Sequence, residues 1–219
     1  MQQYFKTKMM KKVTITLLLC VAWVLTVNAQ NTVESIRKVY QDVHEWIAQM
    51  GTGLPSEYFD LHVVQNLPAT GPHNENIRMY YGEEESEDEE EYNPYPPHYL
   101  RFATAKYNFA AREFCEEYLY DDKGNVMFIY VLTPDVELNM SSAYELRMWF
   151  DGDRLLRFMA KKAEGLDYID IPSLRKAKFT EVYSGTAIPE LYQDETNRCK
   201  QRAERFLAMF KGIDENTYL

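Results

Sequence analysis

The chain has 219 residues, of which 46% are hydrophobic and 26% charged, and its formal net charge is −10 at neutral pH. Residues 1–29 hold four lysines and no acid, so residues 30–219 carry 20 basic against 34 acidic side chains, a net charge of −14. Such a surface repels the phosphates of nucleic acids and of anionic membranes, so nucleic acid is not an expected partner. The 190 residues from 30 to 219 are most simply one domain with a sizeable core.

Residues 1–29 have the three parts of a cleavable signal peptide. Lysines precede an apolar run over 13–27, and short side chains stand at Val27-Asn28-Ala29, where we expect cleavage after Ala29. The run has 15 residues, fewer than the roughly 20 that a membrane-spanning helix needs. We therefore expect a periplasmic or secreted protein of a Gram-negative bacterium, without a membrane span after cleavage.

Three alternatives concern this segment. An uncleaved anchor is disfavoured by the short run. A lipid-modified Cys20 would need a small residue before it, and Leu19 stands there. The initiator is either Met1 or Met10, because Met10 gives the more compact signal peptide.

Residues 31–50 are predicted to form an amphipathic helix. Asn31 and Glu34 can form a capping pair at its N-terminus, and Gly51 and Gly53 would end it. Apolar side chains recur every three or four residues, which is the spacing of one helical face. They are Val33, Ile36, Tyr40, Val43, Ile47 and Met50.

Three segments rich in aromatic and branched residues, 57–65, 77–81 and 99–109, are predicted to be strands. An acidic loop at 82–97 separates the second from the third. Eight of the nine residues 83–91 are Asp or Glu, and prolines follow. Like charges at this density repel one another and prolines cannot pair in a central strand, so we expect a solvated, disordered loop.

A first β-hairpin is predicted to join 114–120 to 126–132. The turn between them contains Gly124, which can adopt the positive φ that a tight turn needs. Residues 126–132 are apolar on both faces, which is typical of a strand in the middle of a sheet.

A second β-hairpin is predicted to join 144–151 to 154–160. Its turn is Gly152-Asp153, a pair that suits a two-residue loop. This register sets Asp151 opposite Arg154, an opposite-charge pair that stabilises neighbouring strands.

The C-terminal part ends in a predicted helix over 194–210, with Gly212 as its stop. Before it, 166–171 and 179–183 could each form a short strand, the first closed by Pro172. The apolar face of the helix carries Cys199, Ala203, Phe206 and Phe210.

These elements predict an α+β fold in which a curved antiparallel sheet of about five to seven strands packs against an N-terminal and a C-terminal helix, both on one face. The outline resembles cystatin-like and other curved-sheet, helix-wrapping folds of envelope proteins. This resemblance is one of topology, covers most of residues 30–219 loosely and rests on no family motif. It therefore implies a fold and no particular function.

Two cysteines, Cys115 and Cys199, remain after residue 29. In an oxidising compartment they could form a disulfide that ties the middle of the chain to the last helix. They could equally be buried free thiols that pack as small apolar residues. Sequence sets neither their distance nor their geometry, so both alternatives stay open.

Metal, cofactor and nucleophile motifs are missing from the sequence. His44 begins a zinc-protease pattern, but position 48, one turn on, is Ala. The acidic segments 121–125 and 151–153 resemble fragments of calcium loops and are better explained as hairpin turns. No catalytic, cofactor-binding or metal-binding residue is predicted, and no cofactor is expected.

Carboxylate chemistry is the one enzymatic option that the composition leaves. Two acids at a suitable separation are sufficient for glycoside hydrolysis, and at least one of them must be desolvated. Sequence alone cannot pair the candidates, which are Glu113, Glu116, Glu117, Glu145 and Asp151.

The functional expectation is an exported, non-enzymatic binding or interaction module whose partner is a protein, a glycan or a small ligand. A contact patch of exposed tyrosines beside the acidic run suits partner recognition. Two alternatives stay open: a carboxylate-based hydrolase of envelope or extracellular polymers, and a carrier whose apolar cavity holds a small apolar ligand. The patch residues are Tyr92, Tyr95, His98 and Tyr99.

Overall fold

The computed structural model describes residues 31–52, 57–83, 96–110, 112–134, 142–164 and 171–217. Internal contacts divide the chain into two units, Met1–Asn31 and Thr32–Leu219, and the second unit contains every helix and strand described. Within the described ranges, no helix combines the length and the apolar character needed to cross a membrane.

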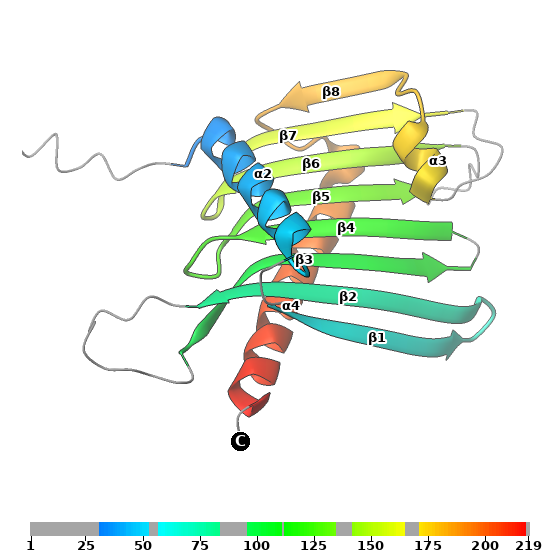
Figure 1. Cartoon of the computed structure of the whole chain (residues 1–219). Coiled ribbons are helices and arrows are strands. Elements are labelled where there is room, and N and C mark those ends of the chain that lie inside the picture. The colour runs from blue at the N-terminus through cyan, green and yellow to red at the C-terminus, as the bar shows by residue number, and fades with distance from the viewer. Residues whose placement is uncertain are drawn as a thin grey trace, which may run out of the picture. The chain divides into compact units, whose positions relative to one another are not determined.

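One open, fully antiparallel sheet forms the second unit, and its eight strands lie in chain order (Figure 1). The prediction of an antiparallel α+β fold is confirmed, but the expected five to seven strands are too few. The eighth strand is β8, which overlaps the segment 179–183 that the sequence indicated only as a possible strand, and it is short and mostly exposed at the sheet edge. The strands are β1 Tyr58–Leu67, β2 Gly71–Glu83, β3 His98–Phe109, β4 Arg112–Tyr120, β5 Val126–Pro134, β6 Ala143–Asp151, β7 Arg154–Ala163 and β8 Glu181–Gly185.

The helices cover both faces of this sheet (Figure 1). α2 (Val33–Gln49) and the short α3 (Ile171–Lys176) lie on one face, and α4 (Gln193–Thr217) lies on the other. The prediction that both long helices share a face is therefore wrong. The physical reason is in the central strands β4 and β5, whose side chains are buried on both sides, so each face needs a cover.

Two apolar layers result. Under α4, the predicted helix face packs on alternate residues of β2 to β7, including Met79, Tyr118, Ile129, Leu146 and Phe158. On the α2 face, Ile36 and Val43 of the helix pack on residues of the sheet side, which are Tyr80, Phe102, Leu119, Met127, Phe128 and Trp149. Each large apolar side chain removed from water contributes about 1.5–3 kcal/mol, so both interfaces stabilise the sheet.

The helix ends differ from the predicted ones. Thr32, not Asn31, caps α2: its side chain accepts from the Ser35 amide at 3.1 Å, and the Ser35 hydroxyl accepts from the Thr32 amide at 2.9 Å. α4 passes through Gly212 and continues to Thr217, because a glycine disfavours a helix without forbidding it.

Both predicted hairpins are confirmed. In the first, Gly124 has φ +82°, and the Asp121 carboxylate accepts from two backbone amides of the turn. In the second, Asp151 pairs with Arg154 in the predicted register, and their side chains form an ion pair at 2.8 Å.

Two segments fold differently from the prediction. Ile171, predicted as the last residue of a strand, and Pro172 lie in the first turn of α3, where a missing amide costs no intrahelical hydrogen bond. The predicted strand at 166–171 lies mostly outside the described residues. β2 extends to Glu83 and β3 begins at His98, so the predicted loop at 82–97 is shorter than expected, and its residues 84–95 lie outside the described ranges.

Candidate functional site

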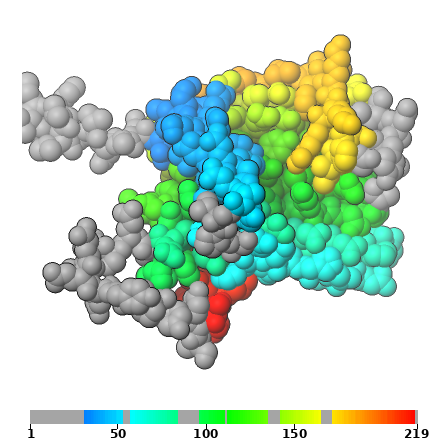
Figure 2. Space-filling model, viewed as in Figure 1, coloured from blue at the N-terminus to red at the C-terminus, as the bar shows by residue number. Residues whose placement is uncertain are grey.

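A pocket of about 510 Å³ lies on the sheet between α2 and α3, above the middle strands β4, β5 and β6. Figure 2 shows this face, with strand residues visible in the hollow between the two helices. The lining combines three arginines, two glutamates and four aromatic rings: Arg37, Tyr40, Glu117, Phe128, Tyr130, Glu145, Arg147, Trp149 and Arg175.

Strand register assembles the pocket floor. Glu117 of β4 pairs with Tyr130 of β5, which pairs with Arg147 of β6. Because paired residues share a face, the three side chains form a row across the sheet, with Glu117 and Arg147 two strand spacings, about 10 Å, apart. Glu145 lies two residues before Arg147 and projects from the same face.

Glu117 is a buried carboxylate whose negative charge is stabilised by neighbouring side chains. The Tyr40 hydroxyl of α2 donates a hydrogen bond to it, and His44 Nε2 lies 3.7 Å from its Oε2. Burial alone would raise the pKa of Glu117, but His44 and Tyr40, with the charge of Arg175, outweigh it and hold that pKa below its usual value. Glu117 is therefore ionised at neutral pH.

Glu145 is the second buried acid of the pocket, with a side chain only 9% exposed. Arg147 Nε lies 2.8 Å and Lys161 Nζ 3.6 Å from its Oε1. The Arg147 Nε–H is not aligned with Glu145 Oε1. Arg147 Nε and Glu145 Oε1 are therefore both buried without a hydrogen bond to the described residues. Charge attraction to Arg147 and Lys161 therefore stabilises the Glu145 carboxylate in this position.

The three arginines differ in how they are held. Arg147 lies over the Tyr130 ring at 5.6 Å, and Arg175 donates to Cys115 Sγ at 3.7 Å. Arg37 lies over the Trp149 ring at 5.3 Å and forms no ion pair with any described carboxylate. The face of the Trp149 ring attracts this guanidinium without neutralising its charge.

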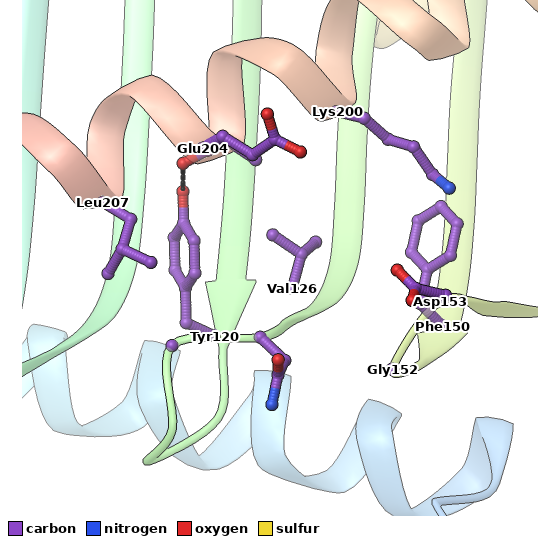
Figure 3. Close-up of a pocket in the computed structure, with 11 residues that line it drawn as sticks. Tyr120, Val126, Phe150, Gly152, Asp153, Lys200, Glu204 and Leu207 are labelled. Atoms are coloured by element: carbon purple, nitrogen blue, oxygen red, sulfur yellow. Dashed lines mark hydrogen bonds between the residues drawn. The ribbon is translucent and has the colours of Figure 1, made fainter.

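A smaller pocket of about 270 Å³ opens on the α4 face, at the turns of the two hairpins. Figure 3 shows Tyr120 pointing to the helix, where its hydroxyl donates to the Ala203 carbonyl at 2.9 Å, and Lys200 reaching over the Phe150 ring. Its acids, Asp153 and Glu204, are both exposed. This pocket lacks the desolvated charges that distinguish the larger one.

The disulfide that the sequence left possible is not formed: Cys115 and Cys199 are free thiols on opposite faces of the sheet. Cys115 is packed against Leu174 of α3, whereas Cys199 belongs to the buried face of α4 and packs on the other face of the sheet. Of the two alternatives that sequence left open, the structure has the buried free thiols.

The predicted partner patch is only partly described. Tyr92 and Tyr95 lie outside the described residues. The side chain of His98 is 7% exposed, and its Nδ1 lies 2.7 Å from a carboxylate oxygen of Asp214 in α4. Tyr99 is half-buried, and its ring packs over Gly82, where an added Cβ would meet it at 3.0 Å.

Among the five candidate carboxylates, the structure brings Glu117 and Glu145 into one pocket. Glu113 instead accepts from the Ile171 amide at 3.1 Å, and Asp151 serves the hairpin turn. Glu116 projects from the opposite face. Sequence reasoning missed the arginines of the pocket, because only the pairing of β4, β5 and β6 and the position of α3 bring them together.

The described residues contain no group of three His, Cys, Asp or Glu side chains arranged to hold a metal ion. No family model matches the chain, and comparisons with curated proteins and with solved structures find no match either. The class that fold and pocket define is thus an α+β protein with an open eight-stranded antiparallel sheet and a charged pocket on one face.

Proposed function

We propose that this chain is an exported, non-enzymatic binding module whose ligand occupies the pocket between α2 and α3. The observation that carries the proposal is the composition of this 510 Å³ pocket, which combines desolvated charges with aromatic rings. Pockets of this size and lining hold small ligands in many proteins. Export is supported by the charge, apolar core and cleavage order of residues 1–29.

The lining favours binding over chemistry. Glu117 is held in its ionised form by its neighbours, so it is unsuited to donate a proton. The charges also set this pocket apart from the apolar cavity that a carrier of an apolar ligand requires.

A second candidate function is the two-carboxylate hydrolase, because Glu117 and Glu145 are both buried and line one pocket. In that reaction Glu145 would have to be the acid and Glu117 the nucleophile or stabilising anion. Glu145 is already engaged by Arg147 at 2.8 Å and Lys161 at 3.6 Å, whereas a catalytic acid must have a carboxyl free to reach the leaving-group oxygen, which argues against that role.

The test is a small-molecule screen followed by NMR on the exported protein. We expect hits to shift the signals of Arg37, Tyr130 and Arg175 and to be recovered unchanged after long incubation. Hits that instead map to Lys200 and Leu207 would move the binding site to the other pocket. Turnover that is lost in Glu145→Gln would establish the hydrolase. An N-terminus at Gln30 after export checks the signal peptide.

A further inference from the structure

The described charges of the pocket do not cancel, and the excess is positive. Arg37, Arg147 and Arg175 line it, and Lys161 adjoins it through Glu145. Among the described residues that line the pocket, only two carboxylates, Glu117 and Glu145, accompany these four cations. This excess is found on a chain whose net charge is −10, so it is local to this face.

We infer that the pocket binds a small ligand through an oxyanion group, a carboxylate, phosphate or sulfate, which the guanidinium groups of Arg37 and Arg175 hold from two sides. This inference rests on the proposed binding function and names its ligand class. A planar guanidinium matches such groups with two parallel N–H donors, which an ammonium group cannot do.

The two glutamates are already engaged by protein groups. Glu117 accepts from the Tyr40 hydroxyl, and Glu145 lies against Arg147 and Lys161. A cationic ligand would therefore have to displace these partners, whereas an anion meets two guanidinium groups, Arg37 and Arg175, that form no ion pair with a described carboxylate.

Arg37 and Arg175 are the cations of the pocket with N–H donors left for a ligand. Both are exposed residues that line the pocket, one from α2 and one from α3. Arg37 has no carboxylate partner among the described residues, and the only hydrogen bond described for Arg175 is to a thiol. Both retain donors for a ligand, since each guanidinium has five N–H groups. The aromatic rings that also line the pocket, Tyr130 among them, provide a surface for the ligand body.

The test uses matched probes on the exported protein, followed by NMR of the arginine Nε–H signals. One series is glucose, glucosamine, glucuronate, glucose 6-phosphate and glucose 6-sulfate, and the other is benzamide, benzylamine, benzoate, phenyl phosphate and benzenesulfonate. We expect the anions alone to shift the signals of Arg37 and Arg175, with an affinity that falls as salt is added. The comparison of carboxylate, phosphate and sulfate identifies the preferred oxyanion.

Variants separate a binding role from a structural one. Arg37→Gln and Arg175→Gln should each weaken binding of the preferred anion about tenfold or more. Arg205→Gln on α4 removes the same charge from the opposite face and should leave binding unchanged. Glu145→Gln should strengthen anion binding several-fold, because it removes a negative charge from the pocket. A merely structural role of Glu145 would not produce this gain.

A neutral or cationic probe that binds this pocket as well as the anions do would overturn the inference and leave the binding function standing. Anion binding that Arg37→Gln and Arg175→Gln do not weaken would also overturn it. If no anion shifts these signals up to about 10 mM, the inference fails. If no compound of the wider screen binds the pocket either, the proposed function fails with it.

Discussion

Glu116 and Glu117 are consecutive in β4, yet their carboxylates lie on opposite faces of the sheet and bind different helices. Glu116 accepts from Arg202 of α4 at 2.7 Å, and Glu117 accepts from Tyr40 of α2. Alternation along a strand separates two adjacent, identical side chains in this way. One acid therefore anchors α4, while the other belongs to the candidate site.

Replacing Glu116 by Gln should destabilise the fold by about 3 kcal/mol or more. Glu116 is fully buried and accepts from four donors: Tyr107, Tyr118, Arg198 and Arg202. Its loss leaves two partly buried guanidiniums without their shared carboxylate. Urea unfolding measures the change, and Glu204→Gln, an exposed site on α4, serves as the control. Equal effects of the two substitutions would contradict the anchoring role of Glu116.

Acidification should lower the stability of the fold by protonating Glu116. Burial alone would raise the pKa of Glu116, but Arg202 and Arg198, with the two tyrosine hydroxyls, lower it below its usual 4.5. The unfolded chain therefore takes up this proton first as the pH falls. The stabilisation is complete above about pH 4.5 and is lost as the pH falls through the folded pKa. Urea midpoints measured from about pH 6 to about pH 3 should drop in the native chain and change less in Glu116→Gln.

Tyr40→Phe should raise the pKa of Glu117 and destabilise the fold by about 1.5–3 kcal/mol, because a hydrogen bond to a buried carboxylate is lost. A carbon-detected NMR titration of the Glu117 carboxyl gives the pKa, and thermal unfolding gives the stability. Tyr58→Phe is the matched control, since that hydroxyl has no hydrogen bond described. An unshifted Glu117 titration would show that Tyr40 does not stabilise the ionised form.

Both thiols should resist modification in the folded state. Cys115 and Cys199 are fully buried, and burial raises the pKa of each, so little thiolate is present at neutral pH. Iodoacetamide labelling with peptide mass mapping should find neither residue labelled in buffer and both labelled in denaturant. A peptide pair joined through the two cysteines would show that the described packing is wrong.

Two glycine substitutions isolate the effect of backbone conformation. An added Cβ meets nothing within 4 Å at either Gly212 or Gly152. Gly212 lies within α4, so Gly212→Ala should stabilise by about 0.5–1 kcal/mol. Gly152 has φ +58°, so Gly152→Ala should destabilise by about 1 kcal/mol. Thermal unfolding of both variants checks the signs, and a stabilised Gly152→Ala would contradict the turn geometry.

Much of the local structure could be predicted. The register of the hairpin at Gly152 and the buried face of α4 follow from short-range patterns, and both are confirmed. Predictions failed where two local signals compete. Gly212 is predicted to end the last helix, but it lies within α4, which packing stabilises. Pro172 is predicted to follow a strand, but it lies in the first turn of α3.

By itself, the sequence determined the antiparallel α+β character, the two long helices and the two hairpins, because each depends on periodicity or turn chemistry within about 20 residues. Only the tertiary structure decided which face each helix covers, that Cys115 and Cys199 lie apart, and that Glu117, Glu145 and three arginines share a pocket. These relationships join residues up to 138 positions apart, from Arg37 to Arg175. They depend on strand pairing and helix docking, which no local pattern encodes.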